Sequence, residues 1–106
     1  MTIEIININD LKPSQIYDIY IDRRSALGNP FILKDESQRD LVCDKYYEWF
    51  NHKLKQKDEK VMFNLDVLRD IHRVYGKLRL FCWCAPKRCH GETIKNYILD
   101  PSWPRQ

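Results

Sequence analysis

The chain has 106 residues, 43% of them hydrophobic and 31% charged, which leaves room for one soluble globular domain with a modest core. Only three glycines are present, which argues against a glycine-rich phosphate loop and against a β-sandwich dense in turns. The formal net charge of +3 is compatible with an anionic small molecule and makes nucleic acid an unlikely partner. Because the core is small, we expect self-association into a homo-oligomer.

No stretch is apolar enough to span a membrane, and the first residues lack both the basic segment and the apolar run of a signal peptide. We therefore expect a cytoplasmic protein with no membrane partner. In a reducing compartment, the four cysteines are better interpreted as thiols or metal ligands than as disulfides.

Two short strands are predicted near the N-terminus. Residues 2–8 alternate β-branched and polar side chains, and residues 16–21 are rich in Ile and Tyr. A helix over 16–21, capped by Ser14, is the alternative for the second segment.

A loop with two arginines follows, over residues 22–31. Within it Gly28 allows a positive φ, and Pro30 restricts Asn29 to an extended conformation. The arginines beside this turn are either donors to a bound anion or solvated side chains of a surface loop, and the sequence leaves both interpretations open.

The rest of the chain predicts helices over residues 37–55 and 61–75, a strand over 77–83 and a helix over 90–99. The resulting order is β-β-α-α-β-α. We expect one small α/β domain over residues 1–100, with about three mostly parallel strands and three helices, followed by an irregular tail over 101–106.

Residues 82–91 concentrate the side chains that could carry chemistry. One hypothesis is a zinc site, with ligands Cys82, Cys84, Cys89 and His90, although the spacing is not a standard one. A second is a reactive thiol, with Cys89 at a helix N-terminus and His90 beside it as acid or base.

Two further hypotheses use the same loop. Cys82 and Arg88 satisfy the C-x5-R spacing of a phosphatase-like loop, but Pro86 removes one of the amide donors that such a loop needs. In a purely binding loop, Trp83 stacks on a ligand and the helix N-terminus at Gly91 offers amides to an anion.

Two blocks of the sequence resemble a family of small proteins known as DUF4326, found in phages, bacteria and some eukaryotes. The first is Ile19 to Phe31, which contains Leu-Gly-Asn-Pro-Phe, and the second is Leu80 to Gly91, which contains Cys-Trp-Cys-x-Pro-x-x-Cys-His-Gly. The resemblance covers nearly the whole chain, and Asp22 stands where the family usually has Gly.

The resemblance implies a fold and a site rather than an activity. Its site residues, carried over by position, are Arg24, Gly28, Asn29, Pro30 and Phe31 together with Cys82, Trp83, Cys84, Pro86, Cys89 and His90. The family's occurrence in phages implies two settings, both in the host cytoplasm. In one, the protein sequesters a nucleotide immune signal; in the other, an enzyme modifies nucleobases of phage DNA.

We expect the arginine loop and the cysteine loop to meet at the carboxyl ends of adjacent strands, where open α/β sheets bind ligands. The leading hypothesis is a binding protein for a nucleotide-like or phosphorylated small molecule. Its expected ligand-binding residues are Arg23, Arg24, Gly28, Asn29, Phe31, Trp83, Pro86 and Gly91.

The alternative is an enzyme acting on a nucleotide or nucleobase, with Cys89 and His90 as catalytic residues and zinc as its only candidate cofactor. An adaptor that binds protein or DNA through a basic face ranks last.

Overall fold

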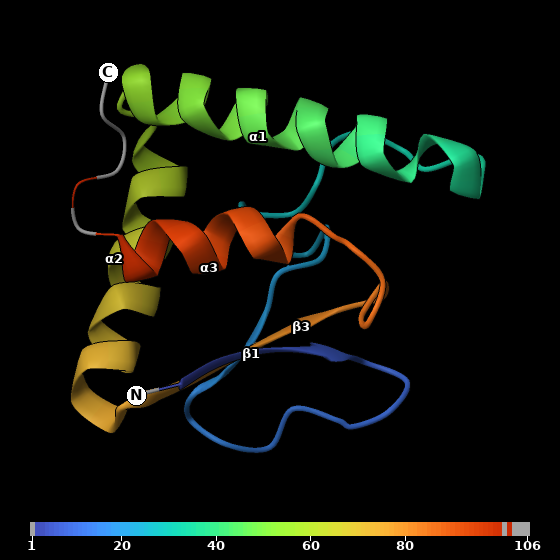
Figure 1. The fold of residues 1–106 in the computed structure, drawn as a ribbon. Coiled ribbons are helices and arrows are strands. Elements are labelled where there is room, and N and C mark those ends of the chain that lie inside the picture. Colours follow the sequence, from blue (N-terminus) through green and yellow to red (C-terminus); the bar gives the residue numbers. More distant parts are fainter. Residues whose placement is uncertain (1, 101, 103–106) are drawn as a thin grey trace.

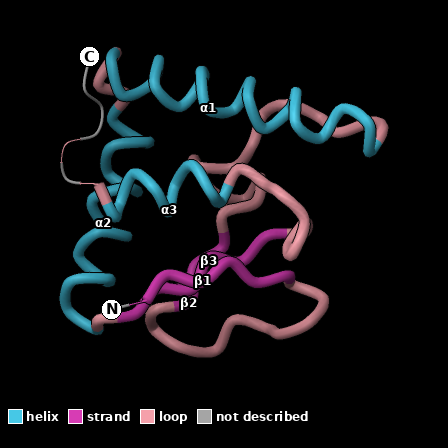
Figure 2. The backbone as a smooth tube through the Cα atoms, in the orientation of Figure 1, coloured by secondary structure: helices cyan, strands magenta, loops and turns pink. Residues whose placement is uncertain are grey.

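The computed structural model describes residues 2–100 and residue 102. The strands are β1 (Thr2–Asn7), β2 (Asp18–Tyr20) and β3 (Lys77–Cys82). The helices are α1 (Arg39–Lys55), α2 (Glu59–Tyr75) and α3 (Gly91–Leu99), with a 3-10 turn η1 (Glu36–Gln38) before α1 (Figure 2). The predicted β-β-α-α-β-α order and the small α/β fold are confirmed. Apart from Ser102, the predicted irregular tail lies outside the described residues.

The three strands form one parallel sheet in the order β1-β3-β2. Asn7 pairs with Cys82, and Tyr20 pairs with Phe81, so all three strands end at the same edge of the sheet. The segments that follow β2 and β3 therefore begin side by side, as expected for a ligand-binding edge.

The central strand β3 is covered on both faces. Leu78 and Leu80 are fully buried on one face, and Phe81 is fully buried on the other, where it packs against Arg79 and Tyr20. Burial on both sides is typical of a parallel sheet enclosed by its connections. Trp83 comes just after the strand and is 54% exposed.

Helix α3 lies between α1 and the sheet (Figure 1). Its predicted apolar face is buried, including Ile94, and the ring of Tyr97 packs edge-on against Phe50 of α1 with 5.5 Å between centroids. Helix α2 packs against β3 and ends at Gly76, whose φ of 67° forms the predicted C-cap. None of the helices in residues 2–100 is long and apolar enough to cross a membrane.

Strand β2 is shorter than predicted because Asp18 organises the turn before it. Its carboxylate accepts hydrogen bonds from the amides of Ser14 and Gln15, both at 2.9 Å, which holds this turn out of the sheet. Bonding to β3 begins only at Tyr17, whose carbonyl oxygen accepts the Arg79 amide at 2.9 Å. The same carboxylate pairs with Arg79 of β3 through two bonds, at 2.6 and 2.8 Å. A single buried acid therefore fixes both the start of β2 and its position beside β3.

We predict that Asp18→Asn destabilises the protein by about 2 kcal/mol, since it leaves Arg79 without its charged partner. The hydrogen bonds from Arg79, followed by those from the two backbone amides, lower the pKa of Asp18 to about 2 from an ordinary 3.8. The folded state then binds fewer protons than the unfolded state, so the stabilisation is present above about pH 4 and disappears as the pH falls towards 2.

Urea unfolding at several pH values measures this effect. The wild type and Asp18→Asn should differ at pH 6 and converge near pH 2. Asp70→Asn is the control, because Asp70 pairs with Arg73 on the exposed surface of α2 and such pairs contribute little. An equal effect of the two variants at pH 6 would contradict the role given to Asp18.

Candidate ligand-binding site

A cavity of about 320 Å³ lies beyond the ends of β2 and β3. Three segments form its wall: the loop after β2, the first turns of α1, and the loop between β3 and α3. The residues that line it are Asp22, Arg23, Arg24, Asn29, Phe31, Leu33, Arg39, Val42, Cys43, Trp83, Cys84, Arg88, Cys89 and His90. Its size lies at the lower end of the range for small-molecule sites.

Asp22 organises the first segment. Its carboxylate accepts two bonds from the Arg24 Nε at 2.9 and 3.1 Å, one from the Arg24 Nη2 at 2.9 Å, and one from the Trp83 Nε1 at 3.0 Å. The Arg24 guanidinium also lies 3.7 Å from the centre of the Tyr20 ring. Burial acts to raise the pKa of Asp22, but the bonds from Arg24 and Trp83 outweigh it and lower that pKa. The acid that departs from the family pattern thus joins the two motif blocks.

The turn at Gly28 is set by close backbone approach. A Cβ at this position would lie 2.4 Å from the Asp22 carbonyl oxygen and 2.7 Å from the Arg23 Cα, so no side chain fits. The φ of Gly28 is not in the left-handed region, so the prediction that this turn needs a positive φ is wrong. Just before it, the Leu27 carbonyl accepts a hydrogen bond from the buried Tyr46 hydroxyl at 2.7 Å.

Arg23 and Asn29 face the cavity from either side of this turn. The Arg23 Nε donates to the Asn29 carbonyl oxygen at 3.3 Å, and the Asn29 Oδ1 accepts from the Phe31 amide at 2.9 Å. Within the described part of the chain, Arg23 forms no ion pair with any carboxylate.

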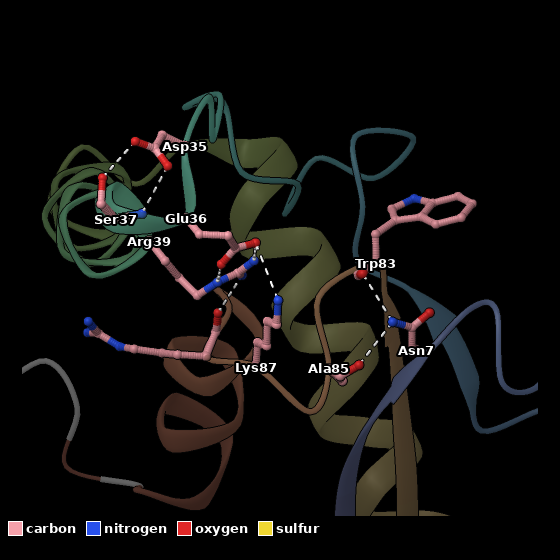
Figure 3. A network of polar contacts seen from close by, with 9 residues as sticks. Asn7, Asp35, Glu36, Ser37, Arg39, Trp83, Ala85 and Lys87 are labelled. Atoms are coloured by element: carbon pink, nitrogen blue, oxygen red, sulfur yellow. Dashed lines mark hydrogen bonds and ion pairs between the residues drawn. The ribbon is translucent and has the colours of Figure 1, made fainter.

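The other two arginines of the wall are paired with acids. Arg39 donates to both oxygens of Glu36 at 2.7 and 2.8 Å and to the Arg88 carbonyl oxygen at 3.0 Å, which ties the start of α1 to the cysteine loop (Figure 3). Arg88 in turn bonds Asp40 at 3.0 Å and Asp44 at 2.9 Å, both on α1.

The cysteine loop is also held from β1. The Asn7 side-chain amide donates to the carbonyl oxygens of Trp83 and Ala85, at 3.1 and 2.9 Å (Figure 3). Figure 3 shows the Trp83 indole projecting from this anchored backbone rather than folding back onto the strands. Trp83 is therefore held at two points: Asn7 bonds its backbone carbonyl, and Asp22 bonds the Nε1 of its indole ring.

Cys82 and Cys89 form a buried thiol pair with their sulfurs 3.5 Å apart. The hydrogen bond from Cys89, helped by the amides of Cys84 and Ala85, lowers the pKa of Cys82. The neighbouring Cys82 sulfur and burial raise the pKa of Cys89. The Cys89 sulfur also accepts the Gly91 amide at 3.3 Å. Cys89 therefore holds its proton at neutral pH.

His90 is held as a neutral ring. Burial lowers its pKa, and its Nε2 hydrogen is donated to the Ile21 carbonyl oxygen. The imidazole packs edge-on against Tyr46, with ring centroids 4.9 Å apart. These contacts engage the Nε2 of His90 and fix the orientation of its ring.

The four zinc ligands predicted from sequence do not converge. Within the described residues, no three His, Cys, Asp or Glu side chains are grouped so that they could hold a metal ion. Cys82 does not line the cavity, and the Nε2 of His90 is hydrogen-bonded to the Ile21 carbonyl oxygen. The arrangement therefore does not fit a zinc ion.

Most of the residues predicted from sequence do meet at the cavity. Those on its wall are Arg23, Arg24, Asn29, Phe31, Trp83, Cys84, Cys89 and His90, whereas Gly28, Cys82, Pro86 and Gly91 are not. The sequence interpretation missed Arg39 as a wall residue and considered Arg88 only as part of a phosphatase-like loop. The signal for Arg39 lies in the alternating charges around the start of α1, which also fit an ordinary solvated helix.

The chain matches a domain of unknown function, DUF4326, over residues 6–100. The chain belongs to the DUF4326 family. It is also 29% identical, over 82 residues, to an uncharacterized 12.4 kDa protein from the nrdA–td intergenic region of Enterobacteria phage T4. That match covers 77% of this chain and 68% of the phage protein. No solved structure matches this chain significantly.

Membership in DUF4326 confirms the resemblance inferred from the two motif blocks. In the structure, the Leu-Gly-Asn-Pro-Phe block and the Cys-Trp-Cys block form opposite parts of one wall, joined by the bond between Trp83 and Asp22. In both blocks the glycine allows close packing, because a side chain would crowd neighbouring atoms. A Cβ on Gly91 would lie 3.0 Å from Ile21 Cδ1 and 3.3 Å from the Cys89 sulfur.

Proposed function

We propose that this DUF4326 protein binds a phosphorylated, nucleotide-like small molecule in the cavity at the carboxyl edge of its sheet. The observation that carries the proposal is the position of Arg23, which lines the cavity and has no carboxylate partner among the described residues. A guanidinium in such a place suits the planar, bidentate recognition of phosphate.

The other arginines of the wall support this role to different degrees. Arg24, Arg39 and Arg88 already hold carboxylates, so their charges are largely compensated before a ligand arrives. A phosphate therefore gains most from Arg23, and the paired arginines provide donors that remain directed and charged.

Trp83 supplies the contact for a planar group. Its ring is 54% exposed and fixed by the bond from its Nε1 to Asp22, so little side-chain entropy is lost when a base stacks on it. Since the Asn29 Oδ1 is already bonded to Phe31, its side-chain nitrogen is the atom that would donate to a base or sugar.

The start of α3 has a smaller part than the sequence interpretation gave it. The Gly91 amide donates to the Cys89 sulfur, and the amides of Glu92 and Thr93 donate to the carbonyl oxygens of Cys89 and His90. In the proposed complex, guanidinium groups rather than these amides hold the phosphate.

The similarity to a phage T4 protein supports a biological setting for this binding. A phage-encoded member, acting in the host cytoplasm, would sequester a nucleotide immune signal and keep it from its receptor. Such a role needs affinity and no turnover.

The alternative function is an enzyme acting on a nucleotide or nucleobase. It is favoured by the presence of Cys89 and His90 on the same wall, although both carry protons engaged in local hydrogen bonds. Iodoacetamide labelling at pH 6 separates the two functions: rapid alkylation of Cys89 supports the enzyme, and slow alkylation supports the binding protein.

We predict that Arg23→Ala weakens binding of a nucleotide by about 10- to 100-fold, the effect of losing a charged hydrogen bond of about 1.5–3 kcal/mol. The melting temperature should stay the same, because Arg23 is exposed. Isothermal titration with nucleoside 5′-monophosphates, cyclic mononucleotides and cyclic dinucleotides, compared with the matching nucleosides, measures the loss.

Arg73→Ala is the matched control, because it removes the same charge from a side chain that is 71% exposed on α2. It should leave the affinity unchanged. If both variants lose affinity equally, the attraction comes from net charge and not from the cavity.

A further inference from the structure

The thiol pair of Cys82 and Cys89 has no part in the proposed binding function, yet its geometry is specific. Cys82 is the last residue of β3, and Cys89 comes two residues before the first residue of α3. The two sulfurs lie 3.5 Å apart, and the residues are 1% and 4% exposed. Two regular elements thus bring a pair of thiols into direct contact.

The two members of the pair differ in their access to solvent. Cys89 lines the cavity, whereas Cys82 does not. Of the two cysteines, Cys89 is therefore the one at the cavity wall, where a small polar reagent enters, and the Cys82 sulfur lies 3.5 Å from the Cys89 sulfur. This order, an entry thiol with a resolving thiol in contact, is typical of cysteines that are oxidised reversibly.

The backbone around the pair needs little change to form a bond. A disulfide requires about 2.05 Å between sulfurs, so the gap to close is roughly 1.5 Å, within the reach of small side-chain rotations. Asn7 already anchors the intervening loop through the carbonyl oxygens of Trp83 and Ala85. The loop between the two cysteines is therefore anchored before any bond forms.

We propose that Cys82 and Cys89 form a reversible disulfide when the protein meets a hydroperoxide. The Cys89 thiol passes its proton to the adjacent Cys82 thiolate as the Cys89 sulfur attacks one peroxide oxygen. The O–O bond breaks, the leaving oxygen takes up a proton, and Cys89 becomes a sulfenic acid. The Cys82 sulfur then attacks the Cys89 sulfur, the S–O bond breaks, and water leaves with the thiol proton. In total two thiols lose two hydrogens, and hydrogen peroxide is reduced to two waters.

The test treats the native, reduced protein with hydrogen peroxide, removes the peroxide, denatures the protein and labels the free thiols with a maleimide before mass spectrometry. The number of labelled cysteines should fall from four to two. A peptide digest should contain Cys82 joined to Cys89, and dithiothreitol should restore all four labels. Cys43→Ser and Cys84→Ser are the controls and should keep the Cys82–Cys89 link.

Cys82→Ser and Cys89→Ser should each abolish this disulfide, and Cys82→Ser should leave Cys89 as a sulfenic acid that dimedone traps. The digest of the wild-type protein decides the question even if a variant fails to fold. Four labels after peroxide treatment, or a disulfide that involves Cys84 or Cys43, would overturn the proposal.

Discussion

Gly28→Ala is expected to destabilise the protein by about 3 kcal/mol and to lower its melting temperature by roughly 10–20 °C. The added Cβ would lie 2.4 Å from the Asp22 carbonyl oxygen and 2.7 Å from the Arg23 Cα. Both are backbone atoms, so the loop after β2 must move to relieve the clash. Because the same loop carries Asp22 and Arg23, nucleotide binding should be lost as well.

Gly91→Ala is the matched control for this change. The nearest atom to its added Cβ is Ile21 Cδ1, at 3.0 Å, which is the end of a flexible side chain. Alanine also favours the helix that begins there by about 1 kcal/mol, which offsets the crowding. Thermal unfolding of both variants checks the prediction, and similar melting temperatures would contradict the close-approach explanation of Gly28.

Tyr46→Ala should cost about 3–5 kcal/mol of stability, the range for removing a large aromatic side chain from a core. Tyr46 is fully buried on α1, with its ring against Phe50 and His90 and its hydroxyl bonded to the Leu27 carbonyl. The residue therefore connects the first long helix to the loop that shapes the cavity. Chemical unfolding monitored by circular dichroism measures the loss.

Two variants separate the contributions of Tyr46. Tyr46→Phe keeps the ring and removes only the hydroxyl, which should cost about 1–3 kcal/mol because the Leu27 carbonyl is left unpaired in a buried place. Tyr47→Ala removes a neighbouring tyrosine that is 44% exposed, and its effect should be much smaller. Equal costs for Tyr46→Ala and Tyr47→Ala would show that Tyr46 is not a core residue.

Much of the fold could be predicted from periodicity alone. Helical spacing on α2 and α3 and alternation on β1 are local signals, and each placed an element within a few residues. The length of β2 and the burial of Phe81 could not be predicted in this way. The first depends on Asp18 accepting the amides of Ser14 and Gln15, and the second on the central position of β3 in the sheet.

The candidate site was partly predictable for a related reason. Trp83 directly follows β3, and Arg23 and Asn29 lie in the loop that follows β2, so parallel strands bring these positions to one edge. The bonds of Asp22 to Trp83 and of Arg39 to the Arg88 carbonyl link residues 61 and 49 positions apart, which no local pattern reveals. The same long-range packing turns His90 towards Ile21 and leaves the zinc hypothesis without a site.

The central claim is that the cavity beside Arg23 and Trp83 binds a phosphorylated nucleotide-like molecule, and nuclear magnetic resonance tests it most directly. The three tryptophans of the ¹⁵N-labelled protein give separate indole N–H signals, and Trp83→Phe identifies that of Trp83. Adding a nucleoside 5′-monophosphate or a cyclic nucleotide should shift the Trp83 indole signal and the amides of residues 22–31 in a saturable way, and the matching nucleoside should shift them far less. Spectra that stay unchanged with every nucleotide, or shifts confined to α2, would contradict the account.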